Sequence, residues 1–218
     1  MNAPIVHKIR NHSVWLSSER CIYWEAEKAL IISDLHFGKT GHFRKSGIPV
    51  PQAVYKEDLH RLLDQVHYFQ PRELIVVGDL FHSRMNRELE LFKKWRSDFT
   101  GLPIKLIKGN HDILQSDWYA DAGIEVYDNH FTMADFTFIH DIEDKSGGSN
   151  NYFFSGHIHP GISIRGAGRQ SLHFPCFYFT DQYCVLPAFS RFTGTYSVSP
   201  QRNENVYAIV DNSIVQLQ

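Results

Sequence analysis

The sequence predicts an α/β fold in which a mainly parallel sheet packs against a second, more antiparallel sheet. In the first half of the chain, short apolar runs alternate with amphipathic helical patterns, which is typical of parallel βαβ units. After about residue 122 the helical periodicity fades, and short segments with alternating side chains follow. Metal-binding side chain types occur at the ends of several apolar runs, where the carboxyl ends of strands would bring them together.

The elements expected in the first half are a hairpin, three buried strands and two helices. Polar residues 17–20 separate two apolar segments, so we expect a hairpin over residues 14–24 at a sheet edge. Helical spacing of apolar residues after Pro51 predicts a crossover helix over residues 52–68. A second helix is expected over residues 87–99, because Gly101-Leu102-Pro103 would end it. Continuous apolar runs predict buried strands at residues 30–32, 74–77 and 104–107.

The second half is expected to consist of strands. Apolar runs predict strands at residues 136–139 and 152–154. Alternating segments predict further strands at residues 161–164, 171–174, 177–180, 183–186, 207–210 and 213–217. The chain has 218 residues and no repeat, low-complexity tract or linker, so we expect a single domain over residues 1–218.

Composition excludes several classes of protein. Hydrophobic residues make up 43% and aromatic residues 14% of the chain, which is too rich for a disordered protein. Three widely spaced cysteines without a Cys-x-x-Cys pair support neither a disulfide framework nor a zinc ribbon, so a reducing cytoplasm is expected. No signal-peptide pattern or run of about 18 apolar residues occurs, which predicts a soluble protein without a membrane partner. The sequence gives no indication of oligomeric state.

Seven side chains form an ordered series of candidate metal ligands. Each lies at or just past the end of an apolar run, so we expect all of them to meet at one edge of the fold. Nitrogen and oxygen ligands without thiolates suit a pair of divalent ions such as manganese, iron or zinc. The series is Asp34, His36, Asp79, Asn110, His140, His157 and His159.

The spacing of these residues predicts how two ions would be shared. Asp34 and His36 are two positions apart, so at a strand end they would face the same way. Asp79 follows Gly78 and has the short carboxylate needed to bridge two ions. We therefore expect one ion to bind Asp34, His36, Asp79 and His159, and the other to bind Asp79, Asn110, His140 and His157. A water between two such ions loses its proton near neutral pH and becomes a nucleophile for phosphate esters.

Other residues are candidates for proton transfer and phosphate binding. His111 follows Asn110 directly and is the expected general acid, with Asp112 as the carboxylate that holds its ring. Lys39 and Arg44 lie in a stretch without acids after Asp34, and they are expected to contact a substrate phosphate. The net charge is only −2, so the chain as a whole lacks the basic character of a nucleic-acid coat protein.

The motifs Asp-x-His, Gly-Asp, Gly-Asn-His-Asp, His and Gly-His-x-His, in this order, resemble those of the calcineurin-like metallophosphoesterases. The resemblance implies a two-sheet β-sandwich flanked by helices in an αββα four-layer arrangement, with a dinuclear centre that often holds manganese. The chain is further similar to the bacterial DNA ligase-associated metallophosphoesterases over nearly its whole length. That likeness rests on Phe43-Arg44-Lys45-Ser46-Gly47-Ile48-Pro49, Gly78-Asp79-Leu80-Phe81-His82-Ser83 and Leu186-Pro187-Ala188-Phe189.

This closer resemblance implies a DNA-directed phosphodiesterase or nuclease that acts in repair beside a DNA ligase, a helicase and a second nuclease. Ser190 departs from the pattern, which has a glycine there. An alternative is a small-molecule phosphoesterase acting on nucleotides or on cyclic or pyrophosphate-linked metabolites, and steep salt dependence would favour the polymer instead. A non-catalytic scaffold would have eroded ligands, and none is eroded. The protein serine/threonine phosphatases fit less well, because Leu80-Phe81-His82 replaces their Asp-Arg-Gly group.

Overall fold

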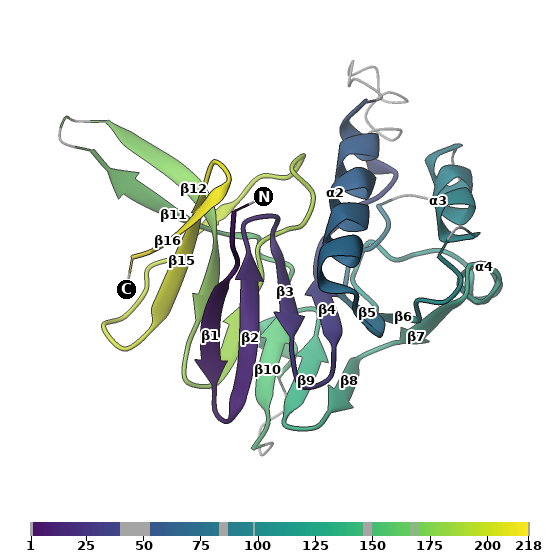
Figure 1. Ribbon diagram of the computed structural model, residues 1–218, viewed down its shortest axis with the longest axis horizontal. Helices are drawn as coiled ribbons and strands as arrows, with labels where there is room; N and C mark the ends of the chain where they lie inside the picture. The colour runs from purple at the N-terminus through teal and green to yellow at the C-terminus, as the bar shows by residue number, and fades with distance from the viewer. Residues whose placement is uncertain are drawn as a thin grey trace.

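The computed structural model describes residues 2–39, 53–82, 87–97, 99–145, 150–166, 168 and 170–217. Two sheets pack face to face, and helices cover the outer face of the first sheet (Figure 1). None of the described helices combines the length and the apolar character that crossing a membrane requires.

The first sheet has seven strands in chain order. Its first four strands are antiparallel neighbours, and the last four form parallel pairs. The predicted hairpin over residues 14–24 is present, but it is internal, since an additional strand forms the sheet edge. The strands are β1 (Ile5–Ile9), β2 (His12–Ser17), β3 (Cys21–Trp24), β4 (Ala29–Ile32), β5 (Glu73–Val77), β6 (Ile104–Ile107) and β7 (Ile124–Tyr127).

In the part of the chain that the structure describes, three helices connect the parallel strands. Helix α2 (Ala53–Phe69) precedes β5, α3 (Arg87–Ser97) precedes β6, and α4 (Ser116–Asp121) precedes β7. The first two agree with the predicted helices to within two residues at each end. Helix α4 was not predicted, because six residues are too few to establish a helical period.

Strands β4, β5 and β6 are buried on both faces, which explains why their sequences are continuous apolar runs. Alternate residues of a strand point to opposite faces. Leu30 and Ile32 pack in the cluster under the helices, whereas Ile31 between them packs in the cluster between the two sheets. Covering both faces of a parallel strand removes its apolar side chains from water and stabilises each by roughly 1.5–3 kcal/mol.

The second sheet is mixed. Its order is β14-β11-β12-β13-β10-β9-β8, and β15 pairs with β12 and β16. The predicted segments 171–174 and 177–180 form one continuous strand, which changes neighbours near Pro175: residues 171–175 pair with β11, and residues 176–179 pair with β15. The strands are β8 (His130–Met133), β9 (Phe136–Ile139), β10 (Tyr152–Ser155), β11 (Pro160–Arg165), β12 (Ser171–Phe179), β13 (Tyr183–Val185), β14 (Tyr196–Ser197), β15 (Asn205–Val210) and β16 (Ser213–Gln216).

The predicted two-sheet sandwich flanked by helices is confirmed. Among the described residues, the three α-helices all pack on the first sheet, and only the 3-10 helix η1 (Ile142–Asp144) follows β9 beside the second. The three cysteines are buried and unpaired. Burial raises the pKa of the Cys21 and Cys176 thiols to about 12.

Candidate metal centre

The seven predicted ligands lie together where strand ends of both sheets meet. Asp34 and His36 follow β4, Asp79 follows β5, and Asn110 follows β6. From the second sheet, His140 follows β9, and His157 and His159 lie between β10 and β11. Residues more than 120 positions apart, such as His36 and His159, are thereby brought into contact.

Three of these side chains form a first cluster. The Nε2 atoms of His36 and His159 are 3.2 Å apart, and His159 Nε2 is 3.3 Å from Asp34 Oδ1. His36 Nε2 is 4.0 Å from the same carboxylate oxygen. One cation placed among these atoms could bind all three residues.

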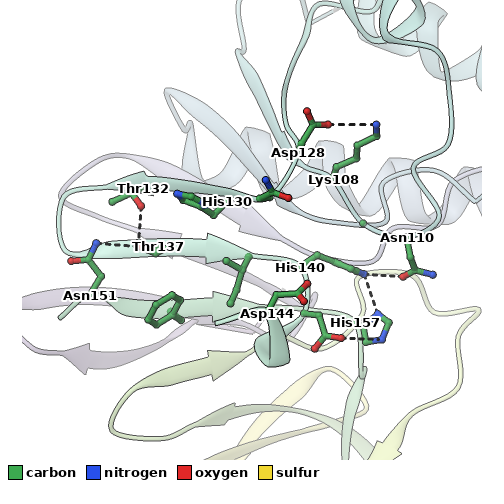
Figure 2. Close-up of a pocket in the computed structure, with 15 residues that line it drawn as sticks. Lys108, Asn110, Asp128, His130, Thr132, Thr137, His140, Asp144, Asn151 and His157 are labelled. Atoms are coloured by element: carbon green, nitrogen blue, oxygen red, sulfur yellow. Dashed lines mark hydrogen bonds and ion pairs between the residues drawn. The ribbon is translucent and has the colours of Figure 1, made fainter. Parts of the chain in front are cut away.

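A second cluster gathers around His140. Its Nε2 lies 3.2 Å from Asn110 Oδ1, 3.1 Å from His157 Nδ1 and 3.6 Å from Asp79 Oδ2. Figure 2 shows the imidazole of His140 between the side chains of Asn110 and His157. These four residues are the set expected from the sequence for the second ion.

Asp79 connects the two clusters. Its Oδ2 is 3.6 Å from His140 Nε2 in the second cluster and 3.9 Å from His36 Nδ1 in the first. Its Oδ1 accepts a hydrogen bond of 2.9 Å from the backbone N–H of His111, which fixes the carboxylate plane. The Asp34 carboxylate also lies within 4.8 Å of both Asp79 and His140 ligand atoms, so it is near both clusters, whereas the sequence assigned it to one ion.

Five of the seven residues have left-handed backbone conformations. The φ angles are 52° for Asp34, 49° for His36, 50° for Asp79, 69° for His157 and 50° for His159. The prediction that Asp34 and His36 face the same way because they alternate along an extended strand is therefore wrong, since both residues lie past the strand end in left-handed conformations. Such conformations cost on the order of 1 kcal/mol or more each and persist only where neighbours hold them. Here the N–H groups of Asp34 and His36 donate to the carbonyls of Gly78 and Asp79.

Glycines make room for three of the side chains. A Cβ at Gly78 would lie 1.9 Å from His140 Nδ1, and one at Gly109 would lie 2.2 Å from Asp79 Oδ1. At Gly156 it would lie 2.4 Å from Asp34 Oδ2. The glycines of the Gly-Asp, Gly-Asn-His-Asp and Gly-His-x-His motifs thus leave the space that the functional side chains fill.

Carbonyl partners set which ring nitrogen of each histidine faces the centre. His140 Nδ1 is 3.4 Å from Val77 O, and His159 Nδ1 is 3.2 Å from Gly194 O. Because a carbonyl can only accept, Nδ1 carries the proton in each ring and Nε2 offers its lone pair to the centre. His157 is reversed: its Nδ1 faces His140, and its Nε2 lies 3.6 Å from Asp141 Oδ2. Asp141, which follows His140 directly, was not among the residues predicted from the sequence.

The residues present fit a pair of divalent cations. Among the described residues, the buried Nδ1 of His36 has no hydrogen-bond partner, and burial lowers the pKa of this imidazole to about 2, so the ring is neutral. Burial alone would raise the pKa of Asp34, but hydrogen bonding with His159 and the charges of nearby histidines outweigh it and lower the pKa. The neutral ring of His36 and the ionised carboxylate of Asp34, with 4.0 Å between His36 Nε2 and Asp34 Oδ1, are ligand types that suit borderline divalent metals.

Of the two side chains predicted for proton transfer, His111 faces the centre and Asp112 does not contact the His111 ring. The ring centroid of His111 is 5.4 Å from that of His36 and 4.2 Å from that of His82, so His111 faces the centre. The predicted contact between the Asp112 carboxylate and the His111 ring is absent among the described residues. The oxygens of Asp112 instead accept 2.9 Å hydrogen bonds from the N–H groups of Phe81 and Gly109, because the buried loop needs acceptors there. Burial raises the pKa of Asp112 to about 7 despite these bonds.

The predicted phosphate contacts are only partly described. Lys39 is half-buried, and burial lowers its pKa, while the charges of Asp79 and Asp34 raise it. The charges of two predicted ligands therefore act on the Lys39 ammonium. Arg44 lies outside the described residues.

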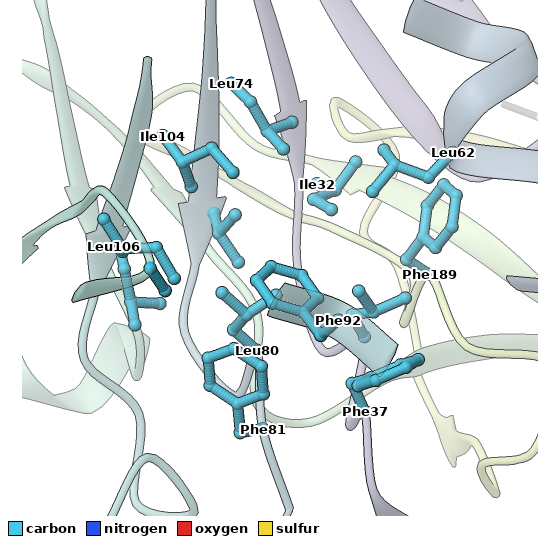
Figure 3. Packing of buried hydrophobic residues seen from close by; sticks show 14 of the residues in the cluster. Ile32, Phe37, Leu62, Leu74, Leu80, Phe81, Phe92, Ile104, Leu106 and Phe189 are labelled. Atoms are coloured by element: carbon cyan, nitrogen blue, oxygen red, sulfur yellow. The ribbon is translucent and has the colours of Figure 1, made fainter. Parts of the chain in front are cut away.

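A loop over residues 186–196 supports the first cluster. The N–H groups of Phe189 and Ser190 donate to the carbonyls of Ser33 and Asp34 at 2.8 and 3.3 Å. Gly194, in the same loop, provides the carbonyl that orients His159. The Phe189 ring packs near Leu62 and Ile32 in the helix-side core (Figure 3). The loop therefore holds the strained backbone at Asp34 and the ring of His159 together.

Buried charges hold the 186–196 loop in turn. The guanidinium of Arg61, on α2, donates to Phe189 O at 3.0 Å and pairs with Asp58 and Glu19 at 2.7 Å. Arg20 donates to Ser190 O at 2.8 Å. The hydroxyl of Ser190 accepts from Phe192 N–H at 3.2 Å, which gives the residue that departs from the family pattern a local role. Nothing periodic in the sequence marked these long-range contacts.

A groove of about 770 Å³ opens from the second cluster along the second sheet. Asn110, His140 and His157 line its inner end, and Thr132, Thr137 and Asn151 line its length (Figure 2). Its carboxylates are Asp128, Asp141 and Asp144, against the single ammonium of Lys108.

Comparisons with known proteins agree with this geometry. A family model described as calcineurin-like phosphoesterase matches residues 28–174. The crystal structure of Pseudomonas putida nuclease MPE is similar with a TM-score of 0.83 and 28% sequence identity, covering 98% of this chain and 100% of that one. Yfce, a phosphoesterase from E. coli, reaches a TM-score of 0.46 and 13% identity, covering 87% of this chain and 97% of that one, which is too distant to support an argument. A comparison with curated proteins found no match.

Proposed function

We propose that this chain is a nuclease that hydrolyses phosphodiester bonds in DNA. The chain belongs to the calcineurin-like phosphoesterase family and is a metal-dependent phosphoesterase, and the proposal proceeds from that premise. The observation that carries the proposal is the likeness to a nuclease along the whole chain, with 28% identity and a TM-score of 0.83. The two clusters joined by Asp79 provide the site for such chemistry.

Asp34, His36, Asp79 and His159 would hold one divalent ion, and Asp79, Asn110, His140 and His157 the other. When bound, such a pair supplies a nucleophilic water near neutral pH and stabilises charge on the phosphoryl oxygens. Manganese is our proposal for the ion, because imidazole, amide and carboxylate ligands without sulfur suit it, as they suit iron and zinc.

The other side chains around the centre have separate tasks in this proposal. His111, whose ring faces the centre, would give a proton to the departing oxygen. Asp112 holds the Gly109–Asp112 turn and thereby the position of His111, without touching its ring. Lys39 and Arg44 would bind a substrate phosphate, Lys39 as a point charge and Arg44 as a planar fork.

The biological setting is part of the same proposal. The sequence likeness to ligase-associated metallophosphoesterases supports a cytoplasmic role in DNA repair beside a DNA ligase, a helicase and a second nuclease. Co-purification with these three proteins from cells under DNA damage would test this setting separately from the chemistry.

The chemistry is tested by adding manganese to purified protein and measuring hydrolysis of bis-(p-nitrophenyl) phosphate, p-nitrophenyl phosphate, and labelled single- and double-stranded DNA. We expect metal-dependent cleavage of the diester and of DNA, with DNA affinity falling steeply as salt rises. Asp79→Asn is the inactive control. Hydrolysis of mononucleotides or small diesters without any cleavage of DNA would contradict the nuclease and favour the small-molecule phosphoesterase.

A further inference from the structure

The floor of the groove is the outer face of the second sheet. In strands β8, β9 and β10, Phe131, Phe138 and Phe154 pack toward the other sheet. The residues that alternate with them face outward, and the strand register sets Thr132 opposite Thr137 and Thr137 opposite Phe153. The described α-helices all cover the other sheet, so this outward row is left to form the floor of the groove.

The groove is continuous with the candidate metal centre. Asn110, His140 and His157 belong both to the second cluster and to the inner end of the groove. A phosphate held at the centre would therefore have one of its ester substituents directed into the groove. The volume of about 770 Å³ lies within the range of pockets that enclose small organic groups.

The charge of the groove opposes a phosphate backbone. Asp128 is paired with Lys108 at 3.6 Å, whereas Asp141 lies 3.6 Å from His157, an imidazole that is uncharged when it binds a metal. Among the described lining residues, three carboxylates therefore face the one permanent cation of Lys108. A chain of phosphates running along this surface would approach three carboxylates and two ammonium groups, that of Lys108 and that of Lys145, which lies 5.2 Å from the centre of the Phe153 ring. An uncharged group meets no such repulsion.

The uncharged residues of the groove lining suit a heterocyclic base and a sugar. Asn129, His130 and Thr132 are exposed in the groove and offer donors and acceptors, while Ile139 and Phe153 provide apolar floor. We propose that the groove binds the nucleoside on one side of the scissile phosphate. This inference rests on the proposed function, and it names the part of the substrate that the groove recognises.

The test uses two diesters with the same leaving group, p-nitrophenyl thymidine 5′-phosphate and methyl p-nitrophenyl phosphate. Thr132→Trp fills the groove from an exposed position on β8, and Val6→Trp on the exposed face of β1 is the matched control. We expect a lower KM for the thymidine ester than for the methyl ester in the unaltered protein. Thr132→Trp should raise that KM about tenfold, as for a lost stacking or pocket contact, and change kcat/KM for the methyl ester less than about twofold.

Binding provides a second readout that does not depend on turnover. Titration of the manganese-loaded protein with thymidine 5′-monophosphate should show about tenfold weaker binding to Thr132→Trp, with manganese affinity unchanged. Equal effects of Thr132→Trp on both esters, or unchanged nucleotide binding, would overturn the groove assignment. If neither ester is hydrolysed but the variant still weakens nucleotide binding, the proposed function fails and the groove assignment stands.

Discussion

The ring of His140 occupies the space that a side chain at position 78 would need. A Cβ built on Gly78 would lie 1.9 Å from His140 Nδ1, and Gly78 has a φ of +80°. The same ring nitrogen faces Val77 O, so the peptide around Gly78 both orients His140 and depends on having no side chain there. Gly78 is thus required because the ring of His140, which follows a strand of the other sheet, fills the space of its side chain.

Gly78→Ala should displace His140 and weaken the second cluster. We expect manganese affinity to fall at least about tenfold and the free energy of unfolding to fall by about 1–3 kcal/mol, from the positive φ and the clash. Isothermal titration and urea denaturation measure the two effects. Gly101→Ala is the matched control, since a Cβ there meets no atom within 4 Å, and an equal loss in both variants would contradict the argument.

Asp79→Asn should abolish turnover and lower the bound metal. The amide oxygen can still accept the His111 N–H, but it lacks the negative charge shared between His36 and His140. We expect a loss on the order of 10³-fold in kcat, since metal-ion stabilisation of the transition state is worth several kcal/mol. Elemental analysis and a diester assay are the measurements. Two bound ions with near-normal activity would refute the bridging role.

His111→Ala should separate metal binding from proton transfer. The ring faces the centre without entering either cluster, so manganese affinity should be unchanged. Esters with poor leaving groups should lose about 10²- to 10⁴-fold in rate, whereas p-nitrophenyl esters should lose much less. The same loss for good and poor leaving groups would mean that His111 does not act as an acid.

Arg61→Lys should loosen the 186–196 loop and, through it, the first cluster. Lysine keeps the charge but cannot contact Phe189 O, Asp58 and Glu19 at once. We expect the free energy of unfolding to fall by about 1–3 kcal/mol. We also expect manganese affinity to fall by more than it does in Arg72→Lys, the same change at an exposed position. Lower stability with unaltered affinity for both ions would show that Arg61 supports the fold and does not position the centre.

His7, which is not part of the metal centre, should make the free energy of unfolding depend on pH. Burial lowers the pKa of His7 from 6.5 to about 4 in the folded protein, so between these pH values the unfolded chain binds a proton that the folded chain does not. Stability should therefore fall as pH drops from about 6.5 to 4, by about 1–2 kcal/mol after allowing for partial exposure. Urea unfolding at pH 7.5 and 4.5 should show a smaller fall in His7→Gln. An identical fall would exclude His7 as the cause.

The sequence was sufficient to predict the parts of the fold that have local signals. Strands β4 to β6 were predicted because their sequences are continuous apolar runs, and helices α2 and α3 because their apolar residues recur with helical spacing. Ser171–Phe179 was predicted as two separate alternating segments, but β12 changes its neighbours near Pro175 and continues.

The candidate site, like the fold, was predictable only where the sequence carries a local signal. The seven residues were found because each follows an apolar run, whereas the left-handed conformations that orient five of them have no signature in residue type. Asp112 was expected beside His111 by adjacency, but the N–H groups of Phe81 and Gly109 compete for its oxygens. The contact between Arg61 and Phe189 joins residues 128 positions apart and cannot be recognised from spacing.

The three cysteines have a practical consequence for studying this protein. Alkylating reagents are attacked by thiolates, and Cys21 and Cys176, with pKa values near 12, hold almost no thiolate at neutral pH while they are enclosed. Cys21 lies in the core beneath the helices and Cys184 in the core between the sheets. Alkylation followed by mass spectrometry would therefore report when each half of the interior opens, without any introduced probe.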